Sequence, residues 1–242
     1  MTQHVALVTG ARTGIGRAIA ERLLRDGYAL GFVTHKEDEV AADELRKFGT
    51  LHHAWGDLAD PNEPKRIVAE VADYFGRLDV LVNNAGLSTA KPALELTADD
   101  FDRTFDVDVR AALLASQEAA RRMTDGGVIV NITSVHEHVP RPGFAVYASA
   151  KAALGMLTRG LALEFAPKIR VVSVAPGAIA TERNVEADDL APEIPLGRPG
   201  TAQEVAAVVA WVASPEASYV SGTSIVVDGA LTHQVVDAPA GQ

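Results

Sequence analysis

The sequence alternates between short runs of aliphatic and β-branched residues and longer segments in which apolar residues recur with helical spacing. Parallel strands need a crossover connection, usually a helix, whereas antiparallel strands can be joined by a tight turn. The alternation therefore predicts an α/β domain in which a parallel sheet carries helices on both faces. The seven expected strands span residues 5–9, 28–33, 51–55, 78–83, 127–132, 170–175 and 223–228.

The expected helices occupy residues 14–26, 37–48, 62–76, 97–124, 147–166 and 201–213. Thr201 and Glu204 have the spacing of a capping box, which supports the start of the last helix. No internal repeat, low-complexity segment or linker divides the 242 residues, so we expect a single domain over 1–242. The stretch 232–242 has no clear periodicity and is interpreted as a C-terminal tail.

The composition restricts the classes of partner. A formal net charge of −10 argues against nucleic acid or an anionic membrane surface. No apolar run has the length of a membrane span, and the first expected strand leaves no room for a signal peptide, so we expect a cytoplasmic protein without a membrane partner. Because the chain has no cysteine, disulfides and thiolate metal sites are excluded, and no metal site is expected.

Ligands of an open parallel sheet bind beyond the carboxyl ends of its strands. The first strand is followed by TGARTGIG at residues 9–16. Glycines at this spacing, directly before an apolar helix, allow a tight turn and a close approach to a pyrophosphate at the helix N-terminus. The expected cofactor contacts in this loop are Gly10, Arg12, Thr13, Gly14, Ile15 and Gly16.

The second strand runs into VTHKED, which bears on the choice of dinucleotide. A carboxylate at this strand end would bind the ribose 2′-hydroxyl of NAD and repel a 2′-phosphate. Val33 occupies that position instead, and the expected contacts Thr34, His35 and Lys36 follow it. The missing acid and the nearby cations favour NADP, with NAD possible, and Arg12 would add to the same phosphate site.

The remaining strand ends carry small or polar residues suited to a nucleotide. GDL follows the third strand, where the acid would meet the adenine amino group or, alternatively, cap a turn. NNAG after the fourth strand lets the chain pass close to a cofactor, and PGAIAT after the sixth forms a rigid turn. The expected contacts from these segments are Asp57, Leu58, Asn83, Ala85, Gly86, Pro176, Gly177, Ile179 and Thr181.

VYASAK at residues 146–151 places Tyr147 and Lys151 four positions apart, on one face of a helix. Hydride transfer to a carbonyl carbon needs a coupled proton transfer at oxygen, and a free tyrosine, with a pKa of about 10, is a poor base at neutral pH. An ammonium within about 4–6 Å favours the phenolate. The same pair also occurs in ordinary half-buried helices, and it is the nucleotide-like strand ends that favour an active site here.

Taken in order, TGxxxGIG, NNAG, Ser134 placed 13 residues before Tyr147, YASAK, PGAIAT and VSGTSIVVDG resemble the short-chain dehydrogenase/reductase family over nearly the whole chain. The resemblance implies a doubly wound Rossmann-type fold with a seven-stranded parallel sheet and a nicotinamide cofactor. It also implies a homotetramer built through the two long helices and the C-terminal strand.

By this resemblance Tyr147 is the general acid/base, Lys151 favours its phenolate and holds the nicotinamide ribose, and Ser134 hydrogen-bonds the substrate oxygen. One position departs from the family pattern. Many relatives carry asparagine within the long fourth helix, where a local kink frees a carbonyl that binds a water near the lysine. FDVDVRA places Asp108 there. We expect its carboxylate to lie within a water or two of Lys151 and to change the charge of the proton relay.

SVHEHVPRPGF and ASPEASYVSG resemble bacterial glucose 1-dehydrogenases of this family. The resemblance implies interconversion of a ketone and a secondary alcohol, with a sugar such as glucose as the favoured small-molecule substrate. The expected substrate contacts are Ser134, His136, Glu137 and Phe144. For His136 and Glu137, an equal alternative is a structural role in a surface turn ahead of Pro140.

The short substrate lid expected at 182–196 favours an open pocket and a bulkier or tethered ketone. That alternative makes the protein a 3-oxoacyl thioester (acyl-carrier) reductase or a general carbonyl reductase. Arg141, Arg183 and Arg198 are the obvious basic contacts for a carrier. A further alternative is a non-catalytic NADP sensor, which would be expected to lose the tyrosine or the lysine that this chain retains.

Overall fold

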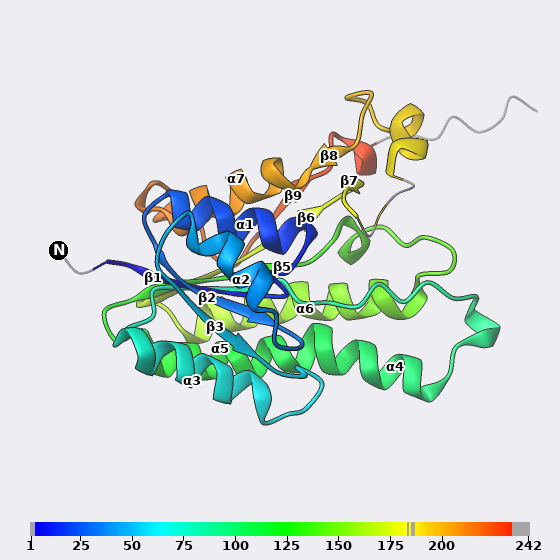
Figure 1. Ribbon diagram of the computed structural model, residues 1–242. Coiled ribbons are helices and arrows are strands. Elements are labelled where there is room, and N and C mark those ends of the chain that lie inside the picture. Colours follow the sequence, from blue (N-terminus) through cyan, green and yellow to red (C-terminus); the bar gives the residue numbers. More distant parts are fainter. Residues whose placement is uncertain (1–2, 183, 185–186, 234–242) are drawn as a thin grey trace, which may run out of the picture.

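The computed structural model describes residues 3–182, 184 and 187–233. Its main sheet has seven strands in the order β3-β2-β1-β4-β5-β6-β9, and every neighbouring pair is parallel (Figure 1). The strands are β1 (Val5–Thr9), β2 (Ala29–Thr34), β3 (Leu51–Trp55), β4 (Val80–Asn83), β5 (Gly127–Ile132), β6 (Ile169–Pro176) and β9 (Ser224–Val227). All seven predicted strands are confirmed, with ends displaced by no more than two residues.

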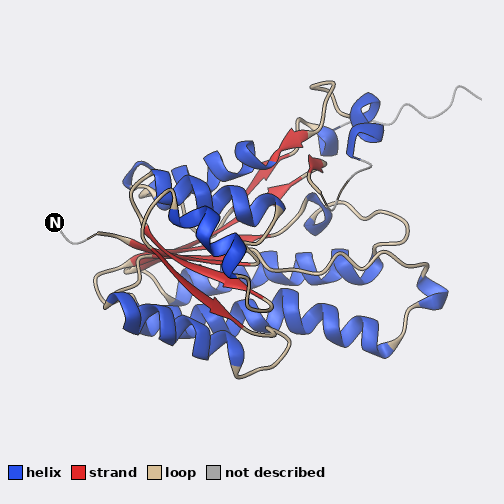
Figure 2. Cartoon of the chain, in the orientation of Figure 1, coloured by secondary structure: helices blue, strands red, loops and turns tan. Residues whose placement is uncertain are grey.

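Helices cover both faces of the sheet, as Figures 1 and 2 show. One face carries α1 (Gly14–Arg25), α2 (Glu39–Arg46) and α7 (Ala202–Ala213). The other carries α3 (Glu63–Phe75), α4 (Ala98–Phe105), α5 (Ala111–Arg122) and α6 (Ala145–Glu164). The doubly wound Rossmann-type arrangement is therefore confirmed, and the predicted capping box of Thr201 and Glu204 opens α7.

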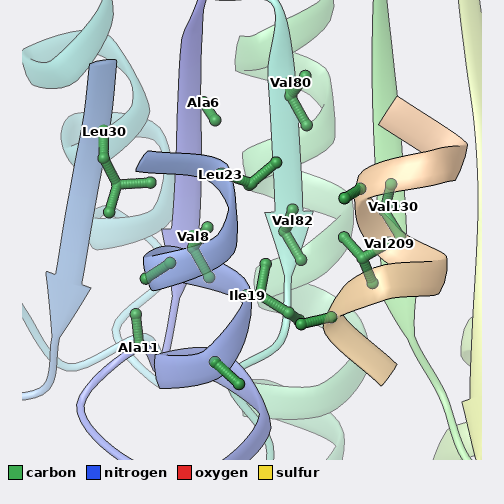
Figure 3. Close-up of a cluster of buried hydrophobic side chains, with 14 of the residues drawn as sticks. Ala6, Val8, Ala11, Ile19, Leu23, Leu30, Val80, Val82, Val130 and Val209 are labelled. Atoms are coloured by element: carbon green, nitrogen blue, oxygen red, sulfur yellow. The ribbon is translucent and has the colours of Figure 1, made fainter. Parts of the chain in front are cut away.

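The core lies in two layers, one on each side of the sheet. In the layer of Figure 3, Ile19 and Leu23 of α1 and Val209 of α7 pack over Val8 and Val130 of the sheet. These side chains are at most 1% exposed. Burying each such aliphatic side chain stabilises the fold by about 1.5–3 kcal/mol. This packing fixes the strand ends where the candidate site lies.

The predicted helix 97–124 is interrupted by a π-helical turn, Asp106–Arg110, between α4 and α5. This confirms the expected kink, and such a bulge turns side chains out of the regular helical register. A second sheet of β7 (Ile179–Ala180) and β8 (Gly200–Thr201) was not predicted, because two-residue strands show no periodicity. Both strands adjoin the expected lid.

Within the expected lid, residues 183, 185 and 186 lie outside the described residues, and Ala187–Glu193 form a 3-10 segment. The expected tail lies outside them too, apart from Thr232 and His233. Thr232 donates a 2.7 Å hydrogen bond to Asp228, just after β9. Among the residues that the structure describes, no helix is long and apolar enough to cross a membrane.

Candidate active site

The glycine loop between β1 and α1 has a shape that only glycine allows. Gly10 and Gly14 have φ values of +64° and +59°, which side chains rarely tolerate. A Cβ on Gly10 would lie 2.8 Å from the Cα of Ala85, and one on Gly16 would lie 2.4 Å from the Gly10 carbonyl oxygen. Because α1 starts at Gly14, its unpaired N–H groups are available to an anion. The loop therefore fits the pyrophosphate of a dinucleotide.

A polar clamp joins this loop to the end of β4. The Thr9 hydroxyl accepts hydrogen bonds from the backbone N–H groups of Asn84 and Ala85, each at 3.0 Å. The Asn84 amide donates to the carbonyls of Thr9 and Gly10, at 2.9 and 3.1 Å. We did not predict this role of Asn84, although the doubled asparagine of NNAG was a signal for it.

Where the 2′-phosphate is expected, Arg12 Nε and Asp38 Oδ2 form an ion pair at 2.7 Å. Asp38 was not predicted as a site residue. Its side chain caps α2 by accepting from the Ala41 N–H, and this bond, followed by the Arg12 contact, holds the pKa of Asp38 below its usual range. The Thr34 hydroxyl donates to the Lys36 carbonyl at 2.6 Å and so shapes the loop after β2.

At the adenine end, one carboxylate oxygen of Asp57 accepts a 3.0 Å bond from the Ala59 N–H, which confirms the turn-cap role. The same oxygen lies 3.8 Å from Nδ1 of His35, and both side chains remain about half exposed. A small cavity next to Leu58 is lined both by predicted contacts and by residues that were not predicted. Its lining includes the predicted Leu58, Asn83 and Ala85 and the unpredicted Thr9 and Val107.

The Asn83 side chain points into the protein. Its amide donates to Asn131 Oδ1 at 2.8 Å, and the Asn131 amide donates to Thr158 Oγ1 at 2.8 Å. This buried network ties β4, β5 and α6 together below the site. Asn83 therefore presents its backbone to the edge of the sheet.

The turn after β6 approaches the glycine loop. A Cβ built on Gly14 would lie 3.5 Å from Cγ2 of Thr181, so Thr181 lies next to the glycine loop. Gly177 packs closely on Asp228, with 2.6 Å between the position of an added Cβ and Asp228 Cβ. Pro176 ends β6 and Ile179 is buried in β7, so both are held in place.

Tyr147 and Lys151, the expected catalytic pair, both lie on α6. Lys151 Nζ is 5.6 Å from the ring centroid of Tyr147 and donates to the Ile132 carbonyl at 3.1 Å. The same Nζ is 3.0 Å from Oδ2 of Asp108. The two charged side chains are 5% and 0% exposed. Burial opposes the ammonium, but the Asp108 carboxylate outweighs it and raises the pKa of Lys151.

Asp108 reaches the lysine because the π-helical turn carries it. Its other oxygen accepts a 2.8 Å bond from the Leu87 N–H, and a Cβ on Gly86 would lie 3.1 Å from both Asp108 and Lys151. The expectation of a water between Asp108 and Lys151 is wrong, since the two groups are in direct contact. The carboxylate thus joins the NNAG segment to the catalytic helix.

Ser134 follows β5 and accepts a 3.2 Å bond from the His136 N–H, which leaves the hydroxyl proton available to a substrate oxygen. The His136 ring stacks on Phe144, with 5.5 Å between centroids, and lies edge-on to Tyr147 at 5.9 Å. His136 Nδ1 is also 2.9 Å from the Val139 carbonyl oxygen. His136, Phe144 and Tyr147 form what we call the aromatic wall.

Glu137 lies away from this wall. Its side chain is 2% exposed, with one oxygen 3.2 Å from His138 Nε2. A Cβ on Gly155 of α6 would lie 2.9 Å from that oxygen, so the missing side chain makes room for the carboxylate. The position of Glu137 therefore gives no support to the expected polyol contact.

Comparison with known proteins agrees with this geometry. The family described as enoyl-(acyl carrier protein) reductase matches residues 10–232. A glucose 1-dehydrogenase of Gluconobacter oxydans is 38% identical, over 93% of this chain and 91% of its own.

Two solved structures share the whole fold. An acetoin dehydrogenase from Enterobacter cloacae is 42% identical, with a TM-score of 0.89 over 100% of this chain and 99% of its own. A short-chain dehydrogenase from Burkholderia cenocepacia in complex with NADP is 39% identical, with a TM-score of 0.91 over 96% and 99%. With the glycine loop and the Tyr147–Lys151 pair in place, the chain belongs to the short-chain dehydrogenase/reductase family and is a nicotinamide-dependent oxidoreductase.

Proposed function

We propose that this enzyme interconverts a small ketone and its secondary alcohol, with a hydroxyketone or vicinal diketone of the acetoin type as the substrate and NADP as the preferred cofactor. The observation that carries the proposal is the Tyr147–Lys151 pair on α6, with its lysine buried and its tyrosine in the compact aromatic wall. The acetoin dehydrogenase named among the similar structures supports this substrate class.

A nicotinamide held by the glycine loop would supply or accept the hydride, and the protein's own residues handle the proton and the charge. In reduction, the Tyr147 O–H gives its proton to the substrate oxygen, and in oxidation the phenolate takes it back. The Ser134 hydroxyl donates to the same oxygen and stabilises the charge that develops there. Lys151 favours the phenolate, and Asp108 keeps the buried lysine protonated.

A sugar remains the second candidate because a glucose 1-dehydrogenase is among the similar proteins. Of the two residues expected to bind a polyol, His136 is held by Phe144 and Val139, whereas Glu137 packs against α6 with its Oε2 atom unpartnered among the described residues. Positioned polar groups are what discriminate hydroxyl-rich substrates. The partners of His136 therefore favour the ketone, and the free oxygen of Glu137 keeps glucose among the substrates to be tested.

An acyl-carrier substrate has less support. Arg198 is held by both carboxylate oxygens of Glu204, at 2.7 and 3.0 Å. Arg141 lies over the Phe144 ring, 5.5 Å from its centroid, and Arg183 lies outside the described residues. Because the matching family is described as enoyl-(acyl carrier protein) reductase, a 3-oxoacyl thioester is included among the substrates of the test below.

The test compares kcat/KM for NADPH with diacetyl, acetoin and a 3-oxoacyl thioester, and for NADP with glucose. We expect the four-carbon ketones to exceed glucose by at least about tenfold, the size of effect that one or two polar contacts produce. A higher value for glucose or for the thioester would overturn the substrate assignment. Cofactor binding without any turnover would instead support the sensor alternative.

The preference for NADP rests on Val33 in place of an acid and on Arg12 and Lys36 nearby. Because the Arg12 side chain is 66% exposed and is shared with Asp38, we expect a moderate preference. The ratio of kcat/KM for NADPH and NADH measures it. An equal value or an NADH preference would contradict it.

We also propose a cytoplasmic homotetramer of single-domain subunits. The described strands other than β7 and β8 form one continuous sheet, which supports the single domain. On α5, α6 and the residue that follows it, a hollow suited to a second copy has apolar lining from Leu113, Leu157, Leu161 and Phe165, and polar lining from Gln117, Arg121 and Glu164. Light scattering during size-exclusion chromatography tests the assembly, and a monomer would contradict it.

A further inference from the structure

The π-helical turn between α4 and α5 is anchored to two separate parts of the site. In its middle, Asp108 contacts Lys151 at 3.0 Å. At its end, Arg110 Nη2 donates a 2.5 Å hydrogen bond to the carbonyl of Ala59. Ala59 belongs to residues 57–60 between β3 and α3, which we call the adenine turn because the base of the cofactor is expected there. The π-helical turn therefore connects the adenine turn to the catalytic lysine.

Arg110 is held through the two terminal nitrogens of its guanidinium. Nη1 pairs with Asp106 Oδ1 at 2.5 Å, within the π-helical turn itself. Nη2 reaches Ala59, which lies 51 positions earlier in the chain. Nε is buried and has no hydrogen-bond partner among the described residues. The bond to Ala59 is thus the contact through which Arg110 holds the π-helical turn to another segment.

The position of a π-helical turn within a long helix depends on such anchors. The Ala111 N–H donates to the Asp106 carbonyl, five residues back, so the helix holds one residue more than an α-helix would. Each α-helical residue rotates the chain by about 100°. If the extra residue moved along the helix, Asp108 would be rotated away from Lys151. The contacts of Asp108 and Arg110 therefore keep the extra residue where it is.

The adenine turn and the helix also line one small cavity. Leu58 of the adenine turn contributes to its lining, together with Val107 and Ala111 of the helix. The turn itself lies at the surface, since the Asp57 side chain is 45% exposed. Exposed turns move easily. A nucleotide base bound against this turn would reduce its motion, and Arg110 would pass the effect to the helix.

We propose that Arg110 is a positioning residue that couples the adenine end of the cofactor site to the catalytic lysine. Because it holds the adenine turn to the π-helical turn, a nucleotide bound at the first also fixes Asp108 against Lys151 at the second. Asp108 and Arg110 are two residues apart on one short turn, so a restraint on either limits the motion of the other. The proposal rests on the cofactor site and the proton transfer proposed above.

The test separates the two halves of the cofactor. Reduced nicotinamide mononucleotide carries the hydride without the adenosine, and adenosine 2′-phosphate carries the adenosine without the nicotinamide. In the wild type, we expect saturating adenosine 2′-phosphate to raise kcat for reduction of diacetyl by the mononucleotide about fivefold, which is the lower end of the coupling between two sites. In Arg110→Met the adenosine 2′-phosphate should still bind, but the stimulation should fall below about 1.5-fold.

Asp106→Asn is the matched control. It removes the partner of Arg110 Nη1 and leaves the bond from Nη2 to Ala59, so it should keep the stimulation. If Arg110→Met does not fold, Arg110→Lys takes its place. Lysine keeps the charge next to Asp106 but has a single terminal nitrogen, which cannot hold both partners, and the stimulation should again be lost.

Hydrogen exchange gives a readout that does not depend on turnover. Adenosine 2′-phosphate should slow exchange of the backbone amides of residues 106–111 at least about threefold in the wild type, and should leave it unchanged in Arg110→Met. Exchange in the wild type that does not respond to adenosine 2′-phosphate would overturn the proposal, as would a stimulation that persists in Arg110→Met. Failure of the proposed substrate or of the NADP preference appears separately, in the kcat/KM values of the wild type with the complete cofactors.

Discussion

The two ends of the site each contain a cation paired with an aspartate, and the pairs differ in burial. Lys151 and Asp108 are in contact at 3.0 Å, with side chains 5% and 0% exposed. Arg12 and Asp38 are in contact at 2.7 Å, with side chains 66% and 20% exposed. Breaking a buried pair leaves a charge without compensation, at a cost of about 3–5 kcal/mol, whereas water screens an exposed pair.

The consequence is a division of roles. At the catalytic end the lysine is held in one position by Asp108 and the Ile132 carbonyl, which suits a proton transfer with strict geometry. At the phosphate end Arg12 can exchange Asp38 for a ligand phosphate at little cost. Changes at the first end should therefore alter chemistry, and changes at the second should alter which cofactor binds.

The largest effect is expected for Tyr147→Phe. The change removes the proton donor and keeps the ring that packs against His136. We expect kcat for ketone reduction to fall by about 10²–10⁴-fold, because that is the usual contribution of a general acid. The dissociation constant of NADPH should stay within about threefold, since the cation pairs at both ends remain. Steady-state kinetics and fluorescence titration measure the two quantities.

Tyr219→Phe, on the exposed surface, is the control and should keep full activity. Retention of more than about a tenth of kcat in Tyr147→Phe would show that the proton comes from another group.

Asp108→Asn should have an intermediate effect on the buried pair. The asparagine oxygen can still accept from the Leu87 N–H, but the negative charge next to Lys151 disappears. As long as Lys151 stays protonated, its positive charge then acts on Tyr147 without the opposing carboxylate, which favours the phenolate. The pH at which alcohol oxidation rises should therefore move lower, and activity at the optimum should fall by less than about tenfold.

The measurement is kcat/KM for alcohol oxidation against pH. Asp106→Asn is the matched control, because Asp106 pairs with Arg110 in the same π-helical turn, and its profile should not move. A loss as large as that of Tyr147→Phe would make Asp108 a direct proton carrier. A shift to higher pH would mean that Lys151 had lost its charge, and an unmoved profile would place Asp108 outside the relay.

The smallest effect is expected for Asp38→Asn at the exposed pair. Asparagine caps a helix as well as aspartate does, so α2 should be retained. Arg12 is released from a carboxylate that is ionised at neutral pH, since the pKa of Asp38 is lowered by the Ala41 N–H and by Arg12. We expect NADPH to bind about two- to fivefold more tightly, with NADH unchanged.

Fluorescence titration of both cofactors checks this result. The control is Asp43→Asn, which removes an exposed acid that pairs with Arg46 within the same helix. Weaker binding of NADPH in Asp38→Asn would mean that Asp38 is needed to orient Arg12, and that its repulsion of the phosphate is the smaller effect.

The sequence by itself determined the secondary-structure elements and the family, and it predicted the reactive groups. Strand and helix periodicity come from local burial, so the seven strands were placed within two residues. The glycine spacing and the four-residue step from Tyr147 to Lys151 are local as well, and a helix converts that step into a shared face. The kink near Asp108 was also expected, on the family pattern.

Only the tertiary structure decided which side chains meet. The Asn84–Thr9 clamp, the Arg12–Asp38 pair and the hydrogen bond from Arg110 to Ala59 join segments that are separate in the sequence, and no local period encodes them. Glu137 shows the same limit, because its direction depends on the space left by Gly155 of α6. Side-chain partners follow from how helices pack on the sheet, and that packing is a property of the whole fold.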